Sequence, residues 1–334
     1  MIKILKKQWF VVLIALIFIG FAIFSVYDTN KGKLPGKSVD GKDVVAGLKG
    51  DVNITADELY KNLSKTYGKS MLFMKFQAEV INSSIKTTDE LKKTAEEYES
   101  NIKQSAESQA ASSGTDAEAL ISQNIAQYGF TSDQLYDYCM TVAKMEKMQN
   151  DYISKHLDEL FTPIYKEKKS RTVSHILIKM EDANKPTKKE LEKVQKVEDA
   201  LKKGDSFADV AKKYSDDGSA SDGGYLGYMD SDTSYVDSFK NAAFKLKAKE
   251  TSDWVKESND SYNGWHLIKV EETDKAKLEK DKKAKDSLYK AIANGTENLS
   301  NTYLWEAAKK LDIKYANDDV KKQIMDILDV KRCV

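Results

Sequence analysis

The sequence predicts a mixed α+β protein in which a small antiparallel sheet lies between two mainly helical regions, with a membrane-spanning helix at the N-terminus. Three observations predict this. Residues 9–27 form an apolar run without a charged side chain. Segments that alternate between β-branched and polar residues gather within residues 171–271. On both sides of that region, apolar residues recur at helical spacing among many charged ones.

The composition excludes several classes of function. The 53 Lys and Arg side chains balance 53 Asp and Glu side chains, so no net charge attracts the chain to nucleic acid. Arg171 and Arg332 are the only arginines, although arginine is the side chain best suited to bidentate phosphate recognition. The histidines and cysteines do not cluster as zinc ligands do. We therefore expect no nucleic-acid partner, no metal and no cofactor.

The N-terminal apolar run has the features of a membrane anchor. It follows a short tail, residues 1–8, that carries three lysines. As a helix, residues 9–27 span roughly 28 Å at about 1.5 Å per residue, close to the hydrocarbon thickness of a bilayer. Trp9 and Tyr27 stand at its two ends, where interfacial aromatic residues are expected. We expect an uncleaved single span with the bulk of the chain outside the cytoplasm; a cleaved signal peptide is the alternative.

Residues 28–45 are polar and rich in Lys and Gly, and are predicted to be a linker. Residues 46–168 are predicted to form a short strand, a turn and then a series of helices. One of these helices carries several methionines, which indicate either plain core or the pliable lining of a binding groove. Three capping boxes are expected to begin helices: Thr55 with Glu58, Thr87 with Glu90, and Thr131 with Gln134.

The middle of the chain has a different pattern. "RTVSHILI", residues 171–178, is typical of a strand. A helix follows over residues 187–203, begun by a capping box of Thr187 and Glu190, with Leu191, Val194, Val197 and Leu201 as its apolar stripe. Then come a short helix in "DSFADVAKKYS", a glycine-rich stretch that ends in a possible strand, and another short helix in "SYVDSFKNAAFKL". The segments "DWVKE" and "GWHLIKVEE" are predicted to form an antiparallel hairpin.

From residue 274 onward the chain is predicted to return to charged helix, with apolar positions at Leu288, Ile292, Leu299, Leu304 and Leu311. Cys139 and Cys333 lie far apart in the sequence, so we expect two unpaired thiols, with a disulfide as the alternative.

The glycine-rich stretch "YSDDGSASDGGYLGYM" does not have the spacing of a phosphate-binding loop or of a helix-loop-helix calcium site. His175 and His266 lie in predicted strands on either side of it. A lone strand histidine is usually a core residue, but two of them flanking one such turn indicate a site. No serine or cysteine motif accompanies them, so a nucleophilic triad is not supported.

Four motifs occur in order over about a hundred residues: "SHILI", "FADVAKKYSDDGSASDGGYLGYM", "FKNAAFKL" and "GWHLIKV". Together they resemble a parvulin-type peptidyl-prolyl isomerase domain, here residues 169–273. The flanking segments, residues 46–168 and 274–334, resemble those of PrsA-type extracytoplasmic foldases, in which the terminal segments form a helical chaperone domain and the parvulin domain is inserted between them.

The resemblance implies a set of site residues. The family's paired histidines match His175 and His266, and a position that holds Cys or Asp matches Asp217. Tyr235 stands where many relatives have Met, and Asn263 where a small hydroxyl residue is common. The loop after residue 179 lacks the arginine pair of phosphate-selective parvulins, so no phosphate selectivity is implied. The implied wall of the proline pocket consists of Leu226, Met229, Tyr235 and Phe239.

The implied function is that of a membrane-anchored peptidyl-prolyl isomerase and chaperone that assists the folding of exported proteins with X-Pro bonds. A holdase whose parvulin domain only binds peptides is the first alternative, and a tethered structural protein is the second. The sequence leaves homodimer formation open.

Overall fold

The computed structural model describes residues 38–39, 41–48, 52–258 and 263–329. It distinguishes two compact units, Met1–Phe76 and Gln77–Val334. The predicted tail and span at residues 1–27, most of the predicted linker, and Cys333 lie outside the described residues. Within the described ranges, no helix combines the length and the apolar character needed to cross a bilayer.

The first unit contains a small antiparallel sheet of strands β1 (Ser38–Val39), β2 (Lys42–Leu48) and β3 (Val52–Thr55). The end of the predicted linker is therefore strand rather than coil, and a second strand replaces the predicted turn directly before the helix. Helix α3 (Ala56–Ser84) begins where the Thr55 hydroxyl accepts a hydrogen bond from the Glu58 backbone, as one half of the predicted capping box would. This helix continues into the second unit.

The second unit begins with a group of helices that pack side by side, α4 against α5 and α6. Thr88, and not Thr87, is the residue that caps α4, because its extended backbone lets its hydroxyl accept from the Leu91 N–H. The capping box at Thr131 and Gln134 is present, although it opens a short 3-10 turn before α6. The helices are α4 (Asp89–Ser113), α5 (Ala117–Ala126), the 3-10 turn η1 (Ser132–Gln134), α6 (Leu135–Lys155) and α7 (Leu157–Glu167).

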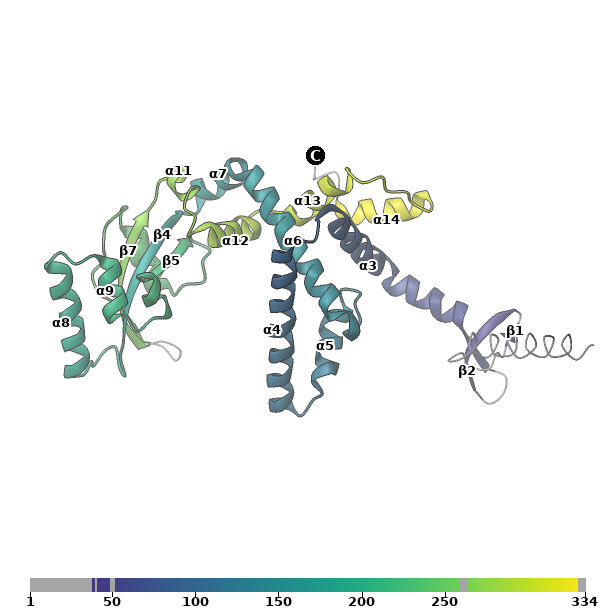
Figure 1. Cartoon of the computed structure of the whole chain (residues 1–334), viewed down its shortest axis with the longest axis horizontal. Coiled ribbons are helices and arrows are strands. Elements are labelled where there is room, and N and C mark those ends of the chain that lie inside the picture. The colour runs from purple at the N-terminus through teal and green to yellow at the C-terminus, as the bar shows by residue number, and fades with distance from the viewer. Residues whose placement is uncertain (1–37, 40, 49–51, 259–262, 330–334) are drawn as a thin grey trace, which may run out of the picture. The chain divides into compact units, whose positions relative to one another are not determined.

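A four-stranded antiparallel sheet follows in the described part of this unit, in the order β5-β4-β7-β6 (Figure 1). The predicted strands and hairpin are confirmed. His175 of β4 lies opposite Ile268 of β7, and His266 of β7 lies opposite Leu177 of β4. The strands are β4 (Arg171–Lys179), β5 (Tyr225–Met229), β6 (Val255–Ser258) and β7 (Asn263–Glu272).

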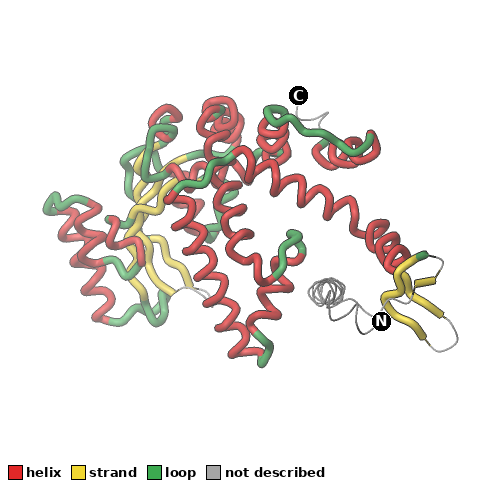
Figure 2. The backbone as a smooth tube through the Cα atoms, turned by 45° about the vertical axis from the view of Figure 1, so that its right-hand side comes forward, coloured by secondary structure: helices red, strands yellow, loops and turns green. Residues whose placement is uncertain are grey.

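The two faces of the sheet carry separate hydrophobic clusters, because successive side chains of a strand point to opposite sides. Helices α8 (Lys188–Lys202) and α9 (Phe207–Tyr214) cover one face, as Figures 1 and 2 show, where Ile176, Ile178 and Leu267 are buried. The capping box of α8 is present as predicted, but Leu191 of its predicted apolar stripe is exposed. Leu191 lies about one turn before Val194 and nearly two turns before Val197, both of which belong to the buried cluster on this face.

The other face of the sheet is covered by helix α10 (Asp237–Lys245). Val173, Met229, Phe239 and Ile268 are buried there. Arg171, at the start of β4, links this strand to the C-terminal end of α10. Its Nη1 donates to the Ala243 and Leu246 carbonyls, and its guanidinium lies over the Phe244 ring. One of the two arginines therefore satisfies carbonyls at a helix end, where no intrahelical donor is available.

The helices after the sheet return to those before it. Helices α12 and α13 both contact α6, and α12 also packs against α7 and β5. Segments on either side of the sheet in sequence thus form one helical body. The predicted apolar positions Leu288, Ile292, Leu299 and Leu304 are buried in these helices, and Leu311 is half-buried. The helices are α11 (Lys275–Leu278), α12 (Lys285–Gly295), α13 (Leu299–Ala308) and α14 (Asp318–Leu328).

The glycine-rich stretch runs beside β4 and is fixed to its backbone. The His175 N–H donates to the Gly224 carbonyl at 2.8 Å, and the Leu177 N–H donates to the Ser215 hydroxyl at 3.1 Å. Gly224 has a φ of +77°, and a Cβ built on it would lie 2.1 Å from the His175 carbonyl oxygen. Only glycine fits this close approach of two backbones.

We predict that Gly224→Ala destabilises the chain by about 3 kcal/mol or more, because it combines a left-handed backbone with a contact against main chain that cannot move aside. Gly218→Ala is the matched control, since a Cβ at Gly218 meets no atom within 4 Å. Urea unfolding followed by the fluorescence of Trp254 and Trp265, which pack against the sheet core, measures both. Equal losses in the two variants would contradict the prediction.

Candidate active site

His175 and His266 lie on the same face of the sheet, on neighbouring strands. Their Nδ1 atoms are 3.2 Å apart and form a hydrogen bond, and their rings are nearly parallel at 17°. Both side chains are almost fully buried. The edge of the Phe239 ring, from α10, meets both imidazoles at centroid distances of 5.8 Å. The sheet register and one aromatic ring therefore fix the orientation of the pair.

Asp217 is brought to this pair by the glycine-rich stretch. It caps the 3-10 turn η2 (Gly218–Asp222), and its Oδ1 accepts from the Ser219 N–H at 2.8 Å. The same oxygen lies 3.1 Å from Nε2 of His175. Partial burial alone would raise the pKa of Asp217, but the contacts with Ser219 and His175 outweigh it and hold the pKa well below its usual range. Asp217 is therefore a carboxylate at neutral pH.

Burial determines the protonation state of His266. Burial, together with the neighbouring His175, lowers the pKa of His266 to about 4. His266 is therefore neutral at neutral pH, and one of its ring nitrogens is a proton donor and the other an acceptor. A row of carboxylate, imidazole and neutral imidazole results, running from Asp217 at the edge of the sheet to His266 at its centre.

A pocket of about 190 Å³ opens above this row. It is smaller than the roughly 300–1,000 Å³ of a cofactor or drug-sized site, and suits a single small ring. Leu226 comes from β5, Tyr235 from the loop after it, and Phe239 from α10. The structure thus brings together six of the seven predicted site residues.

Met229 is the exception, and its predicted place in the pocket wall is wrong. It is fully buried among Val173, Ile268 and Val270, beneath the pocket, and does not line it. Met229 is the residue opposite Arg171 at the far end of β5, three positions from Leu226. A side chain without exposed surface supports the floor of the pocket but cannot contact a ligand.

Four lining residues were missed by the sequence analysis: Leu177, Ser234, Val236 and Glu257. The alternation of side chains between the two faces of a strand could have identified two of these four residues. Leu177 follows His175 by two residues, and Glu257 follows Val255, which lies opposite His266. Glu257 accepts a hydrogen bond from the Ser238 hydroxyl, which joins β6 to α10. Ser234 and Val236 belong to an irregular loop, for which the sequence holds no such signal.

Other chemistries find no support in the described residues. No group of three or more His, Cys, Asp or Glu side chains there is arranged to hold a metal ion. Burial raises the pKa of the Cys139 thiol to about 11, so it is not a nucleophile at neutral pH.

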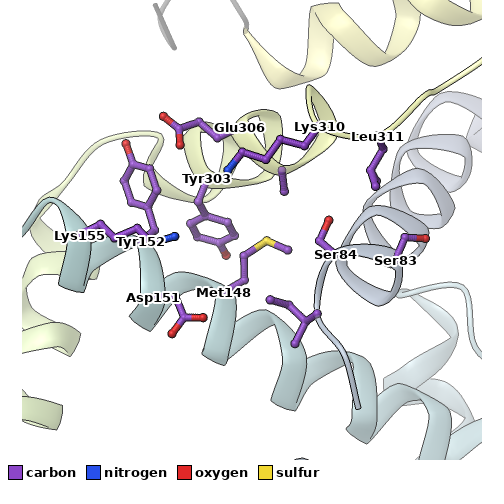
Figure 3. A pocket seen from close by; sticks show the side chains of 12 residues that line it. Ser83, Ser84, Met148, Asp151, Tyr152, Lys155, Tyr303, Glu306, Lys310 and Leu311 are labelled. Carbon is purple, nitrogen blue, oxygen red and sulfur yellow. The ribbon is translucent and has the colours of Figure 1, made fainter. Parts of the chain in front are cut away.

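A larger cavity, of about 440 Å³, lies between the end of α3, α6 and α13. Tyr303 and Met148 project into it, with Lys310 and Glu306 at its rim (Figure 3). None of its described lining residues is a histidine. Met148, one of the methionines of the predicted core helix, thus both belongs to a buried side of α6 and lines a cavity.

Comparisons with known proteins show the family to which the chain belongs. Residues 159–276 match the family model of the PPIC-type PPIase domain. The chain is 31% identical over 303 residues to the foldase protein PrsA of Bacillus subtilis, covering 90% of this chain and 92% of that protein. The chain belongs to the PrsA family. The corresponding protein of Geobacillus kaustophilus is 32% identical over 294 residues, covering 87% and 92%.

A crystal structure of PrsA from Bacillus subtilis also matches, with a TM-score of 0.49 and 27% identity over 84% of this chain and 98% of that one. The isomerase domain and the PrsA relationship identify the chain as a peptidyl-prolyl isomerase and foldase. They favour an active enzyme over the non-catalytic holdase and the structural protein.

The lowered pKa of His266 predicts a pH dependence of stability. Between pH 6.5 and about 4 the unfolded chain binds a proton that the folded chain does not, so the free energy of unfolding falls as the pH falls. The loss is on the order of 2–3 kcal/mol. The stability that Asp217 contributes is lost at lower pH, as the pH falls through its own lowered pKa.

Urea unfolding at pH 7 and pH 4.5, of the natural chain and of His266→Gln, tests this. We expect the difference between the two pH values to shrink in the variant, because Gln does not titrate. The prediction fails if both chains lose the same stability on acidification.

Proposed function

We propose that the pocket above His175 and His266 is the catalytic site, and that it isomerises X-Pro bonds of exported proteins outside the cytoplasm. The observation that carries this is the apolar cup closed by Leu226, Tyr235 and Phe239 over the histidine row. Such a cup suits a pyrrolidine ring, and the imidazoles beneath it offer polar groups to the adjoining peptide bond.

The chemistry required is modest. The X-Pro amide resists rotation by about 18–20 kcal/mol because its C–N bond has partial double-bond character. A thousandfold acceleration requires about 4 kcal/mol of selective stabilisation of the twisted amide. No bond breaks, so no nucleophile is needed. The walls hold the ring and exclude water, which disfavours the charge-separated planar amide relative to the twisted one.

The three polar groups have distinct roles in this proposal. His175 and His266 fix the floor through their mutual hydrogen bond, since the neutral His266 has both a donor and an acceptor nitrogen. Asp217 holds His175 from its other side and sets the field at the substrate carbonyl. Tyr235 closes the wall with its ring centroid 5.0 Å from that of Phe239. An aromatic ring thus occupies the wall position at which many relatives have Met.

The other segments of the chain attach the isomerase domain to the membrane and bind its clients. We assign residues 9–27 as the membrane anchor, with the bulk of the chain on the extracytoplasmic side. The helical segments 46–168 and 274–334 hold unfolded clients near the isomerase domain, residues 169–273. The apolar, positively flanked N-terminal run and the PrsA relationship support this arrangement.

We predict that His175→Ala combined with His266→Ala lowers kcat/KM for a proline peptide by about tenfold or more, because the floor loses its fixed geometry. Suppression of client aggregation is expected to remain, since it depends on the helical segments. His156→Ala is the control: this third histidine stacks on Tyr152 at the junction of α6 and α7, away from the pocket lining. Circular dichroism verifies folding, and unchanged turnover in the folded double variant would refute the assignment.

We predict that the full chain fractionates with membranes and is digested by protease added from outside the cell. Deletion of residues 1–27 is expected to release it. The mass of the mature N-terminus separates an anchor from a cleaved signal: an N-terminus beyond residue 27 would contradict the anchor.

A further inference from the structure

A second cavity adjoins the isomerase pocket. Its volume is about 360 Å³, and it shares Leu226, Ser234 and Tyr235 with the 190 Å³ pocket as a common wall. Its far side is formed by helix α12, which packs against β5. A polypeptide whose proline occupies the smaller pocket therefore has a second hollow directly beyond Leu226 and Tyr235.

Specific hydrogen bonds and an ion pair join β5 and the preceding glycine-rich stretch to the segment around α12. The Ser287 hydroxyl of α12 accepts from the Tyr228 N–H at 2.9 Å, and it would collide with any Cβ at Gly227. Tyr225 and Asp281 are joined by a hydrogen bond of 2.7 Å, and Lys283 forms an ion pair with Asp222. The second cavity is thus held in place relative to the isomerase pocket by contacts on neighbouring residues.

The charges of the two cavities differ. The isomerase pocket contains the carboxylates of Asp217 and Glu257, and no Lys or Arg is among its described lining residues. The second cavity contains two lysines. Lys168 is paired with Asp232 at 2.7 Å.

The remaining charges of the second cavity are Asp230 and Lys290. Asp230 is 3% exposed, and its carboxylate accepts from the Tyr228 hydroxyl and the Asp232 N–H. Lys290, on α12, is exposed, and within the part of the chain that the structure describes no carboxylate lies within ion-pair distance of its ammonium. It is therefore the cation of this cavity that is available to a ligand.

We propose that this second cavity binds the stretch of substrate chain next to the X-Pro bond, and that Lys290 selects an acidic side chain there. The inference rests on the isomerase site proposed above. A carboxylate on the substrate is repelled by Asp217 and Glu257 at the isomerase pocket, whereas beyond Leu226 and Tyr235 it meets Lys290. An extended chain advances about 3.3 Å per residue, so positions two to four from the proline cover about 7–13 Å of substrate chain.

The test uses the full chain and pairs of proline peptides that differ only in Glu or Lys, placed two, three or four positions before or after the proline. For each pair, kcat/KM is measured by isomerisation and Kd by fluorescence anisotropy. At one or more positions we expect the Glu peptide to be preferred about two- to fivefold, the range for an exposed ion pair.

Lys290→Glu is expected to reverse that preference and Lys290→Met to abolish it. Lys285→Glu is the matched control, because it makes the same charge change on the same helix at a residue that does not line the cavity. It is expected to keep the natural ratio.

A ratio near one at every position, or the same ratio in the natural chain and in Lys290→Glu, would overturn the proposal. If no peptide is isomerised, the proposed catalytic site fails and the Kd values alone decide on the cavity. A Glu preference in Kd that Lys290→Glu reverses then supports the second cavity, and its absence overturns it.

Discussion

The pairing of β4 with β7 is the constraint on which the site depends. With His266 opposite Leu177, and His175 opposite Ile268, both imidazoles point to the same side of the sheet and their Nδ1 atoms come within 3.2 Å. A slip of one residue in either strand would turn one ring toward α8 and α9, because side chains alternate between faces. The close approach of Gly224 to the His175 carbonyl protects this register from the other side of β4. The glycine-rich stretch that makes this contact also brings Asp217 next to the His175 ring.

Burial gives this small polar row its properties. An imidazole removed from water holds a proton less readily, which is why the pKa of His266 falls to about 4. The cost of burying the two imidazoles is partly offset by the hydrogen bond between their Nδ1 atoms, and the Asp217 carboxylate lies 3.1 Å from the His175 Nε2. In the proposed function, this fixed row of dipoles does not need to reorganise when a substrate amide twists.

The isomerase region is not an independent appendage in this chain. Two hydrogen bonds and an ion pair join the segment around α12 to β5 and to the glycine-rich stretch, next to the residues that form the pocket. Helix α12 also contacts α6 and α7 of the helical body. The helical body and the pocket are thus linked through one helix.

The sequence by itself determined the order of strands and helices in the middle region, the capping residues Thr131 and Thr187, and the residues that form the histidine row. The strands, helices and caps follow from local periodicity and capping motifs, whereas the residues of the histidine row were implied by the resemblance to the parvulin domain. The linker was less well predicted: its last residues look polar and flexible, yet they pair as β1 and β2. The choice of Thr88 over Thr87 depended on one backbone conformation, which two adjacent threonines do not reveal.

Only the tertiary structure decided how deep each side chain lies. Met229 and Leu226 are three residues apart on one strand, and both are apolar. Met229 is buried in the cluster that α10 covers, and Leu226 opens onto two cavities. The packing of α10 on the sheet and of α12 on β5 decides which surface remains exposed. Lys290 lies 64 positions beyond Leu226 in the chain, and no local pattern relates them. The burial of a side chain and its distance from residues far along the chain depend on contacts between distant segments. The pattern of residues along a single segment does not record such contacts.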